Sequence, residues 1–518
     1  TGEPVLVAGL AEALVLQGKF SEAETLLNAA RRRAPAELRL FLALANLREA
    51  QGRSDDVIAV LAQGIAAHPA SVATKSRLGV TLRRHGRVLA GLGWQRRALG
   101  ATDPIAARDP AAGPVRVVFI VQHPQGWTCL ESVWRAMADD PAFSAVIMAA
   151  PYQHPYPPEG GAEAIYAFLT KAGVPFIHWD KFPLEPGFAD VVFVQNPYDV
   201  TRPKPLHVAN LIRLVPRLAY VPYEIDISGG ETTFAMLYNY PLQNLAWVVF
   251  ARSERHRQMF ARYCGTGDAH VEATGHPKMD QIPAIAACRD AELARWAAGR
   301  KIVLWNPHWE VKPDGTVWGA GCSTFMRWRK DLRSAFARRP GLALVIRPHP
   351  LFFGALESCG VLTRREIEKF QEECAQAGGV WIDRSASYHA VFAAASAILS
   401  DASSFLLEFA ATGKPVGYLH NPRGRGLTDD GAFVRDHCAT VETDEALEKF
   451  LDDVSEGHDP RRAERQAALG EFLFMPPEGA GMLIKGVVAR RLAEEAGVPP
   501  NRRTPPTFSS PMLTHSLL

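Results

Sequence analysis

The chain has 518 residues, a length that predicts roughly three to four domains. Hydrophobic residues make up 47% and charged residues 22%, which excludes wholesale disorder and a fibrous chain. The 57 basic and 55 acidic residues give a formal net charge of +2, so charge provides no global attraction to nucleic acid.

The cysteine pattern indicates the cellular compartment. Seven cysteines are present, an odd number with no C-x-x-C pair, which favours reduced thiols over a disulfide framework or a zinc ribbon. No apolar run reaches the roughly 18 residues of a spanning helix, and the first residues lack a signal-peptide pattern. Abundant Ala and Arg favour a bacterial origin. We expect a cytoplasmic protein, with peripheral contact at the inner face of the membrane as the alternative.

The first hundred residues repeat with a fixed period. Gly18, Gly52 and Gly86 are spaced 34 residues apart, and so are Pro35 and Pro69. Each block predicts a helix, a short turn at the glycine, a second helix and a closing proline. This pattern is typical of tetratricopeptide repeats, so residues 1–100 are predicted to form an all-α array that binds a protein partner or acts as a scaffold.

Basic residues cluster within this predicted array. They are Arg31, Arg32, Arg33, Arg83, Arg84, Arg87, Arg96 and Arg97. We favour a solvated helix face for them. The alternative is a basic surface patch that binds an anionic membrane or an acidic partner.

Short apolar runs that alternate with helical stretches follow a Pro-, Ala- and Gly-rich linker at residues 101–114. In residues 115–290 the runs are Val115–Val121, Ala145–Met148, Val191–Val194, Leu218–Val221 and Trp247–Phe250. In residues 291–497 they are Ile302–Trp305, Leu342–Ile346, Val380–Ile382, Ala397–Leu399 and Pro415–Tyr418.

Apolar runs of this kind predict parallel sheets that are buried on both faces. We therefore predict an α/β protein with two Rossmann-like domains that face a cleft, with the array before them. Residues 498–518 are polar and rich in Pro, Ser and Thr, which predicts a disordered tail.

Three polar clusters follow predicted strands of the second domain. They are Asn306-Pro307-His308-Trp309, Arg347-Pro348-His349-Pro350 and Ser400-Asp401-Ala402-Ser403-Ser404. Ligands of such sheets bind beyond the carboxyl ends of the strands, so these clusters are the candidate binding site.

The residue types suit a nucleotide diphosphate. Ser403 and Ser404 are placed to cap a helix whose N-terminus favours phosphate, and Arg347 offers a bidentate phosphate donor. His349, held between two prolines, is suited to hydrogen bonding with a phosphate or to proton transfer. Glu408, one helical turn on, is suited to accept from ribose hydroxyls.

Each residue has a simpler explanation when taken alone. The serines are suited to an ordinary N-cap, the Arg347 segment to a rigid loop, His308 to packing beside Trp309, and Glu408 to solvent. Their shared position at strand ends favours a site. No His or carboxylate cluster has metal-ligand spacing, so no metal or other cofactor is expected.

From Val115 to about Val454 the chain resembles the CDP-glycerol glycerophosphotransferase family, which has the GT-B architecture. The matching stretches are 193–199 (FVQNPYD), 220–223 (YVPY), 275–280 (GHPKMD), 323–325 (STF), 347–350 (RPHP) and 400–405 (SDASSF) followed by 413–415 (GKP). The last two matches are the most specific, because their spacing and the trailing Gly-Lys-Pro both agree.

The resemblance implies transfer of a polyol phosphate from a CDP-activated donor to an acceptor hydroxyl. It implies that the nucleotide lies against the second domain, and that His349, Asp401, Ser403 and Ser404 contact the donor. The first domain would then bind the acceptor.

The chain departs from the family at the expected catalytic base. Polymerase-type members carry His-Gly-Thr-Pro in the first domain, and the equivalent region here is 221–226 (VPYEID). Glu224, Asp226 and His123 are the candidates to replace that histidine. We rank Glu224 first because it aligns best with it.

Three functions remain open from the sequence. The lead is a CDP-polyol phosphotransferase for a surface glycopolymer, with a glycopolymer or lipid-linked acceptor. The second is a glycosyltransferase that uses a CMP-sugar or another nucleotide sugar and modifies a protein held by the repeats, since His349-Pro350 and Ser403-Ser404 are similar to the HP and SS motifs of bacterial GT-B sialyltransferases. The third is a catalytically inactive GT-B scaffold.

Overall fold

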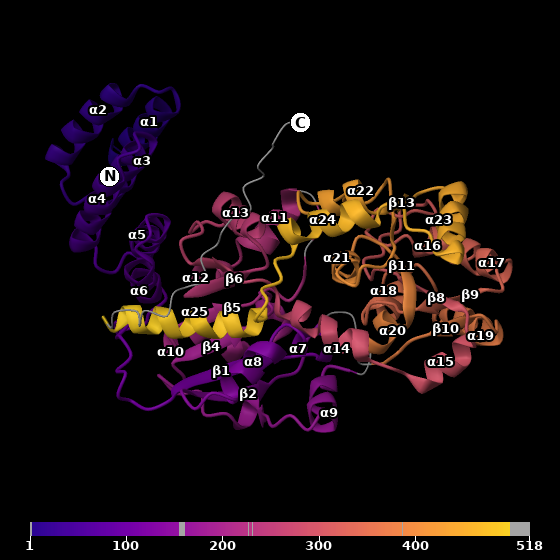
Figure 1. Cartoon of the computed structure of the whole chain (residues 1–518). Helices are drawn as coiled ribbons and strands as arrows, with labels where there is room; N and C mark the ends of the chain where they lie inside the picture. The colour runs from indigo at the N-terminus through magenta and orange to yellow at the C-terminus, as the bar shows by residue number, and fades with distance from the viewer. Residues whose placement is uncertain (1–2, 155–160, 226, 230, 386, 498–518) are drawn as a thin grey trace, which may run out of the picture.

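The computed structural model describes residues 3–154, 161–225, 227–229, 231–385 and 387–497 (Figure 1). Paired helices are followed by a seven-stranded and then a six-stranded parallel sheet, each packed against helices. The prediction of two Rossmann-like domains behind an all-α repeat unit is confirmed. The tail predicted for residues 498–518 lies outside the described residues.

The repeat array consists of three consecutive helix pairs. They are α1 (Glu3–Leu16) with α2 (Phe20–Arg33), α3 (Leu38–Ala50) with α4 (Ser54–Ala67), and α5 (Val72–Arg84) with α6 (Val88–Ala98). Each pair turns at Gly18, Gly52 or Gly86, whose φ values of +73°, +70° and +76° lie in the left-handed region. Glycine adopts that region without a steric cost, which explains the 34-residue period.

The first sheet has the strand order β3-β2-β1-β4-β5-β6-β7. Its strands are β1 (Val115–Val121), β2 (Phe143–Ala149), β3 (Ile177–His178), β4 (Val191–Val194), β5 (Leu218–Tyr220), β6 (Val248–Ala251) and β7 (Val271–Ala273). Its helices are α7 (Pro124–Trp127), α8 (Glu131–Ala138), α9 (Ala164–Lys171), η1 (Trp179–Lys181), η2 (Asp199–Thr201), η3 (Lys204–Leu206), α10 (Val208–Leu214), α11 (Glu231–Tyr238), α12 (Pro241–Leu245), α13 (Glu254–Tyr263) and η4 (Pro277–Gln281).

The second sheet has the order β10-β9-β8-β11-β12-β13. Its strands are β8 (Lys301–Asn306), β9 (Leu342–Ile346), β10 (Val380–Ile382), β11 (Ala395–Ser400), β12 (Val416–Leu419) and β13 (Ala439–Val441). Its helices are α14 (Ile282–Ala287), α15 (Ala291–Ala297), α16 (Phe325–Trp328), α17 (Asp331–Ala337), α18 (Phe352–Ser358), α19 (Arg364–Gln376), α20 (His389–Ala394), α21 (Phe405–Ala410), α22 (Ala432–His437), α23 (Asp444–Glu456) and α24 (Arg462–Phe472).

Burial on both faces explains the continuous apolar runs. Along β8, Ile302 and Leu304 join one core cluster while Val303 and Trp305 join the other. Successive side chains of a strand point to opposite faces, so every position of such a central strand must be apolar.

Three edge strands were not predicted from the sequence. They are β3, β7 and β13, which contain two or three residues each and lie at sheet edges. Segments this short carry no readable periodicity, and they form because a longer neighbouring strand supplies the hydrogen-bonding partners.

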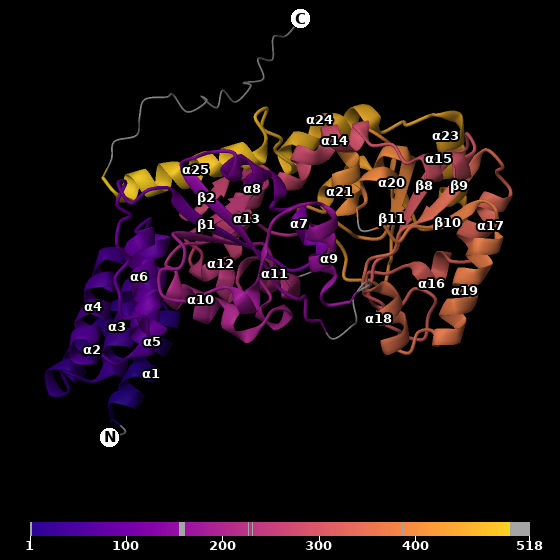
Figure 2. The same cartoon turned by 90° about the horizontal axis from the view of Figure 1, so that it is seen from below.

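The C-terminal helix α25 (Ala480–Glu495) returns to the first sheet (Figure 2). Its residues Ile484, Val488 and Leu492 belong to the core cluster of that sheet, and Asp280 accepts hydrogen bonds from the backbone N–H groups of residues 480 and 481 at 2.7 and 2.8 Å. By packing, α25 therefore belongs with the first sheet, although the sequence-based boundary of 291–497 had placed it in the second domain.

Buried arginines attach the array to the first domain. Arg83 is fully buried and donates to the carbonyl of Ala246 at 2.7 Å, and Arg96 donates to the carbonyl of Ile212 at 2.8 Å. Both carbonyls lie at helix ends, where backbone acceptors are left over. For these two arginines, both interpretations drawn from the sequence, a solvated face and a membrane patch, are wrong.

The two sheet domains are joined across the cleft. Ile225 and Ile227 of the first domain are buried in the core of the second, and Ser228 forms an antiparallel bridge with Leu427. Arg252 at the end of β6 also pairs with the buried Asp430. The loop after β5, which carries the base candidate Glu224, is therefore anchored to both domains.

Candidate active site

Asn306, at the end of β8, connects the three strand-end clusters of the second domain. Its amide donates to the carbonyl of Arg347 at 2.8 Å, and its Oδ1 accepts from the hydroxyls of Ser400 and Ser403, each at 3.1 Å. The prediction that these loops meet at one sheet edge is confirmed. Asn306 itself lies within a predicted cluster, but this role could not be predicted from the sequence.

Asp401 is fully buried and organises the surrounding loops. Its carboxylate accepts from the backbone N–H of His308 at 2.7 Å and from the backbone N–H of Thr324 at 3.1 Å, and it also accepts from the Thr324 hydroxyl. Burial raises the pKa of Asp401 to about 7, against these hydrogen bonds. In this structure Asp401 therefore positions His308 through the backbone.

Arg347 is buried and already paired. Its guanidinium forms an ion pair with Asp383 and donates to the Ser385 hydroxyl at 3.1 Å. The loop after β10 is thereby fastened to the loop after β9. A phosphate contact at Arg347, as expected from the sequence, would have to share the guanidinium with Asp383.

The serine pair caps its helix differently from the expectation. Ser404 is at the N-cap position of α21, but its side chain makes no capping hydrogen bond, whereas the Ser403 hydroxyl accepts from the Phe405 N–H at 3.2 Å. Helix α21 ends at Ala410 and has only six residues, so its dipole is weaker than the sequence suggested.

Three histidines of the cleft share one hydrogen-bonding pattern. Nδ1 of His123, His308 and His349 accepts from the backbone N–H of Gly126, Glu310 and Leu351 at 2.9, 3.0 and 3.2 Å, respectively. A neutral imidazole has one N–H, so an accepting Nδ1 assigns the proton to Nε2. Each ring is therefore set to donate from Nε2.

Burial keeps these imidazoles neutral. It lowers the pKa of His123 and of His308 to about 4 from the ordinary 6.5. Burial also lowers the pKa of His349 well below its usual range, and the neighbouring His308, His123 and His154 add to this effect. At neutral pH the cleft thus offers uncharged N–H donors.

A chain of aromatic rings crosses from one domain to the other. Ring centroids are 4.8 Å apart for His123 and Tyr152, 5.8 Å for Tyr152 and His154, and 5.8 Å for His154 and Trp309. Trp309 is 6.1 Å from His349. The strand-end loops that carry Trp309 and His349 and the His123 loop therefore face each other in one cleft.

Tyr152 and His154 were not predicted from the sequence. They follow β2 in a segment without a motif, and their position after a strand was the only available signal. Both come from the first domain, so they extend that domain's side of the cleft.

The Glu224 charge acts on three tyrosines of the first domain. Burial raises the pKa of Tyr152 to about 12, and burial also raises the pKa of Tyr198 and of Tyr223, with the Glu224 charge as the second cause in each case. This places the carboxylate close to all three phenols. The other carboxylate candidate, Asp226, lies outside the described residues.

Glu408 is engaged across the cleft. Lys278 of the first domain donates to its Oε1 at 2.9 Å, and the two side chains are only 8% and 1% exposed. Oε2 of Glu408 has no hydrogen-bond partner within the described part of the chain. A ribose contact at Glu408 stays a prediction, and this ion pair was not foreseen.

A cavity of about 100 Å³ opens between the domains and is lined by Gln125, Thr128, Glu131, Ser387 and His389 among others.

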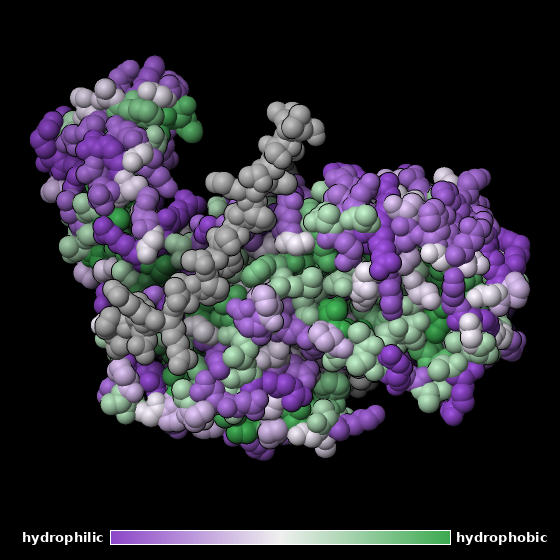
Figure 3. Space-filling view, viewed as in Figure 1, coloured by the Kyte–Doolittle hydropathy of each residue, from purple (hydrophilic) through white to green (hydrophobic). Residues whose placement is uncertain are grey.

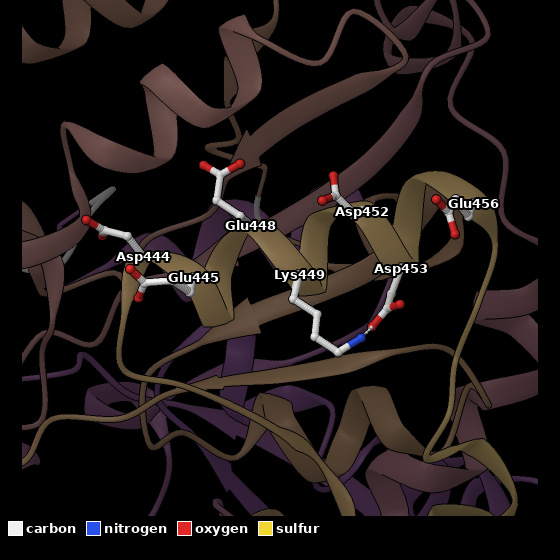
Figure 4. Close-up of a pocket in the computed structure, with 7 residues that line it drawn as sticks. All are labelled: Asp444, Glu445, Glu448, Lys449, Asp452, Asp453 and Glu456. Carbon is white, nitrogen blue, oxygen red and sulfur yellow. Dashed lines mark hydrogen bonds and ion pairs between the residues drawn. The ribbon is translucent and has the colours of Figure 1, made fainter.

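A second hollow, of about 580 Å³, lies along α23 in a hydrophilic part of the surface (Figures 3 and 4). Glu448 there pairs with Arg338, and Lys449 pairs with Asp453. Its lining comes from one helix, so we assign it no role in the chemistry.

Within the described residues, no three His, Cys, Asp or Glu side chains are grouped so that they could hold a metal ion. No helix within the same ranges is long and apolar enough to cross a bilayer.

Comparison with known proteins supports the fold. The chain matches no protein-family model and no curated protein. A crystal structure of UDP-N-acetylglucosamine 2-epimerase is similar over 77% of this chain and 100% of its own, with 13% identity and a TM-score of 0.51. The S. aureus MnaA–UDP complex is similar over 75% and 98%, with 12% identity and a TM-score of 0.50.

The chain has the GT-B architecture. This follows from two facing parallel Rossmann-like sheets and from the two structural likenesses. The wall teichoic acid polymerase TagF is also similar, over 82% of this chain and 99% of its own, with 12% identity. Its TM-score of 0.47 is too low to support an inference. At these identities only the fold is transferred.

Proposed function

We propose that the chain is a transferase that moves a polyol phosphate, such as glycerol or ribitol phosphate, from a CDP-activated donor to an acceptor hydroxyl. The observation that carries this proposal is the convergence of His123, His308 and His349 in one cleft, each with its Nδ1 occupied by a backbone N–H. Donors aimed into a partly dry cleft suit a substrate whose charge develops on oxygen.

The donor would lie against the second domain. The acceptor oxygen forms a bond to the phosphorus of the polyol phosphate, the bond from that phosphorus to the CMP oxygen breaks, and CMP leaves with the electron pair. His308 and His349 would donate from Nε2 to phosphate oxygens. Such donors commonly contribute about 10²–10³ in rate each.

The acceptor hydroxyl would lose its proton on the first-domain side. His123 has Nδ1 occupied and Nε2 protonated, so it suits hydrogen-bond donation better than proton abstraction. Glu224 is a carboxylate in the loop after β5 of the same domain and remains the leading base. A general base typically contributes about 10²–10⁴.

We also propose that the array binds a protein partner or the protein part of an acceptor. Stacked helix pairs present extended binding surfaces, and the buried arginines fix the array relative to the first domain. A glycopolymer or lipid-linked acceptor would instead enter the cleft without contacting the array, at the cytoplasmic face of the membrane.

A second candidate is a nucleotide-sugar glycosyltransferase. Its donor would be a uridine nucleotide sugar, which the similarity in fold to the MnaA–UDP complex supports. In both cases the diphosphate would occupy the same strand-end loops. The third candidate, an inactive scaffold, predicts no transfer from any donor.

A donor panel tests these candidates. Thermal unfolding with CDP, CMP, UDP and GDP should give the largest shift for the cytidine nucleotides, and a ligand at 100 times Kd should add about 2.7 kcal/mol. A larger shift with UDP would replace the lead by the second candidate. Binding without transfer or hydrolysis of any CDP- or UDP-activated donor would favour the scaffold.

A further inference from the structure

A cluster of charges lies beside the donor histidines and has no role in the site described above. The Glu310 carboxylate forms ion pairs with Arg425 at 2.5 Å and with Lys312 at 3.1 Å. The Cys322 thiol also donates a hydrogen bond to it at 3.1 Å. One largely buried carboxylate thus holds two cations whose side chains are 35% and 52% exposed.

Backbone contacts place this cluster at the donor site. Glu310 is two residues from His308, and its N–H donates to His308 Nδ1 at 3.0 Å. The carboxylate and the ring that we assign as a phosphate donor are therefore linked through one short turn. The charges of Glu310 and Arg425 also act on the His308 ring: burial is the main cause of its lowered pKa, Glu310 opposes that shift and Arg425 adds to it.

Arg425 sits on a loop fixed on both sides. Gly424 lies against the Gly321 carbonyl, which an added Cβ would approach to 3.0 Å. The Gly426 carbonyl accepts from the N–H of Gly229, across the cleft, at 3.1 Å. The backbone at Arg425 is therefore held where the two domains meet, while its side chain remains accessible.

We propose that Arg425 is a ligand of the donor diphosphate, and that Glu310 holds it by standing in for the phosphate until the donor binds. The inference deepens the proposed function, on which it rests. Arg347, the expected phosphate ligand, is buried against Asp383, so the more accessible guanidinium paired with Glu310 fills that role. Guanidinium matches phosphate geometry and carries a permanent charge.

The chain supplies a matched control in the same loop. Arg423 forms a similar ion pair, with Asp314 at 2.6 Å, and its side chain is 54% exposed. It differs from Arg425 in that its partner, Asp314, lies further along the loop from His308. Arg423→Gln therefore removes the same charge from the same loop without touching the proposed ligand.

The test is calorimetric titration of CDP and cytidine into full-length wild type, Arg425→Gln, Arg423→Gln and Glu310→Gln. Arg425→Gln should raise the Kd of CDP by about 10–100-fold, the range expected for a lost charge-assisted hydrogen bond, and leave that of cytidine unchanged. Arg423→Gln should match wild type. Glu310→Gln should lower the Kd of CDP, because the competing carboxylate is gone.

Several results would overturn the inference. Equal CDP affinity in wild type and Arg425→Gln, an equal loss in Arg423→Gln, or weaker binding in Glu310→Gln each contradict it while leaving the proposed function intact. If UDP binds wild type in place of CDP, the same series with UDP and uridine applies. If neither diphosphate binds wild type, the proposed function fails and the inference fails with it.

Discussion

The ion pair between Lys278 and Glu408 tests whether the two domains are closed on each other in solution. The atoms are 2.9 Å apart, both side chains are almost completely buried, and each comes from a different domain. Burial opposes the charge on Lys278, but Glu408 raises the pKa of Lys278 above its ordinary value. Lys278→Met would leave a buried carboxylate without its cation, and Glu408→Gln would leave a buried ammonium.

Removing one partner of a buried pair typically costs about 3–5 kcal/mol, whereas replacing both is often close to neutral. We therefore expect each single variant to lower the free energy of unfolding by about that amount. The double variant should recover most of the loss. Urea denaturation of the four proteins, followed by tryptophan fluorescence, gives the coupling energy.

A surface pair provides the control for this cycle. Lys449 and Asp453 are one turn apart on α23, at 3.0 Å, and the lysine side chain is 73% exposed. Lys449→Met should change stability by less than about 1 kcal/mol. If Lys278→Met behaves like this control, or if the double variant is as unstable as the sum of the singles, the cleft is not closed by this pair.

Three further results are expected. His349→Ala should reduce turnover by about 10²–10³, and His349→Gln, whose amide keeps a donor near the Nε2 position, should recover part of the rate; equal loss in both would argue against a donor role. Deleting residues 1–70 should leave nucleotide affinity unchanged. Deleting residues 1–100 should in addition lower the melting temperature, because it also removes the buried Arg83 and Arg96 and the core residue Leu92. Equal melting temperatures of the two deletion variants would contradict the attachment of the array to the first domain. Because the pKa of His123 and of His308 falls to about 4 on folding, the unfolded chain binds more protons than the folded chain between pH 4 and 6.5. Stability is therefore lost as the pH falls through that window, by roughly 2 kcal/mol per histidine at pH 5. In thermal scans, the double variant of both histidines to Gln should lose less stability than wild type between pH 7 and 5, and parallel curves would refute the assignment of low pKa values to these two histidines.

Local sequence signals predicted the parts of the fold that repeat or alternate. The glycines of the array mark turns because only a residue without a Cβ adopts the left-handed region cheaply. The buried strands β1, β4 and β9 were readable because both faces must be apolar. The loops after β8, β9 and β11 were readable as a site because parallel strands end at one edge.

Contacts between residues distant in sequence could not be predicted. Arg83 looked like a surface arginine because nothing near it shows that Ala246 lies opposite. Lys278 and Glu408 are 130 positions apart, and His154 follows β2 without a motif. A local pattern shows how a segment folds, whereas the partner of a buried charge is set by how the domains pack.

The central claim is that the cleft between the two sheet domains binds a nucleoside diphosphate through the strand-end histidines. Hydrogen–deuterium exchange with and without CDP or UDP tests it directly, because it locates binding without requiring the acceptor. The account predicts slower exchange in segments 306–310, 347–351 and 400–405, and in the His123 loop, with no change in α1–α4 or α23. Protection confined to the array or to α23, or no protection with either nucleotide, would contradict it.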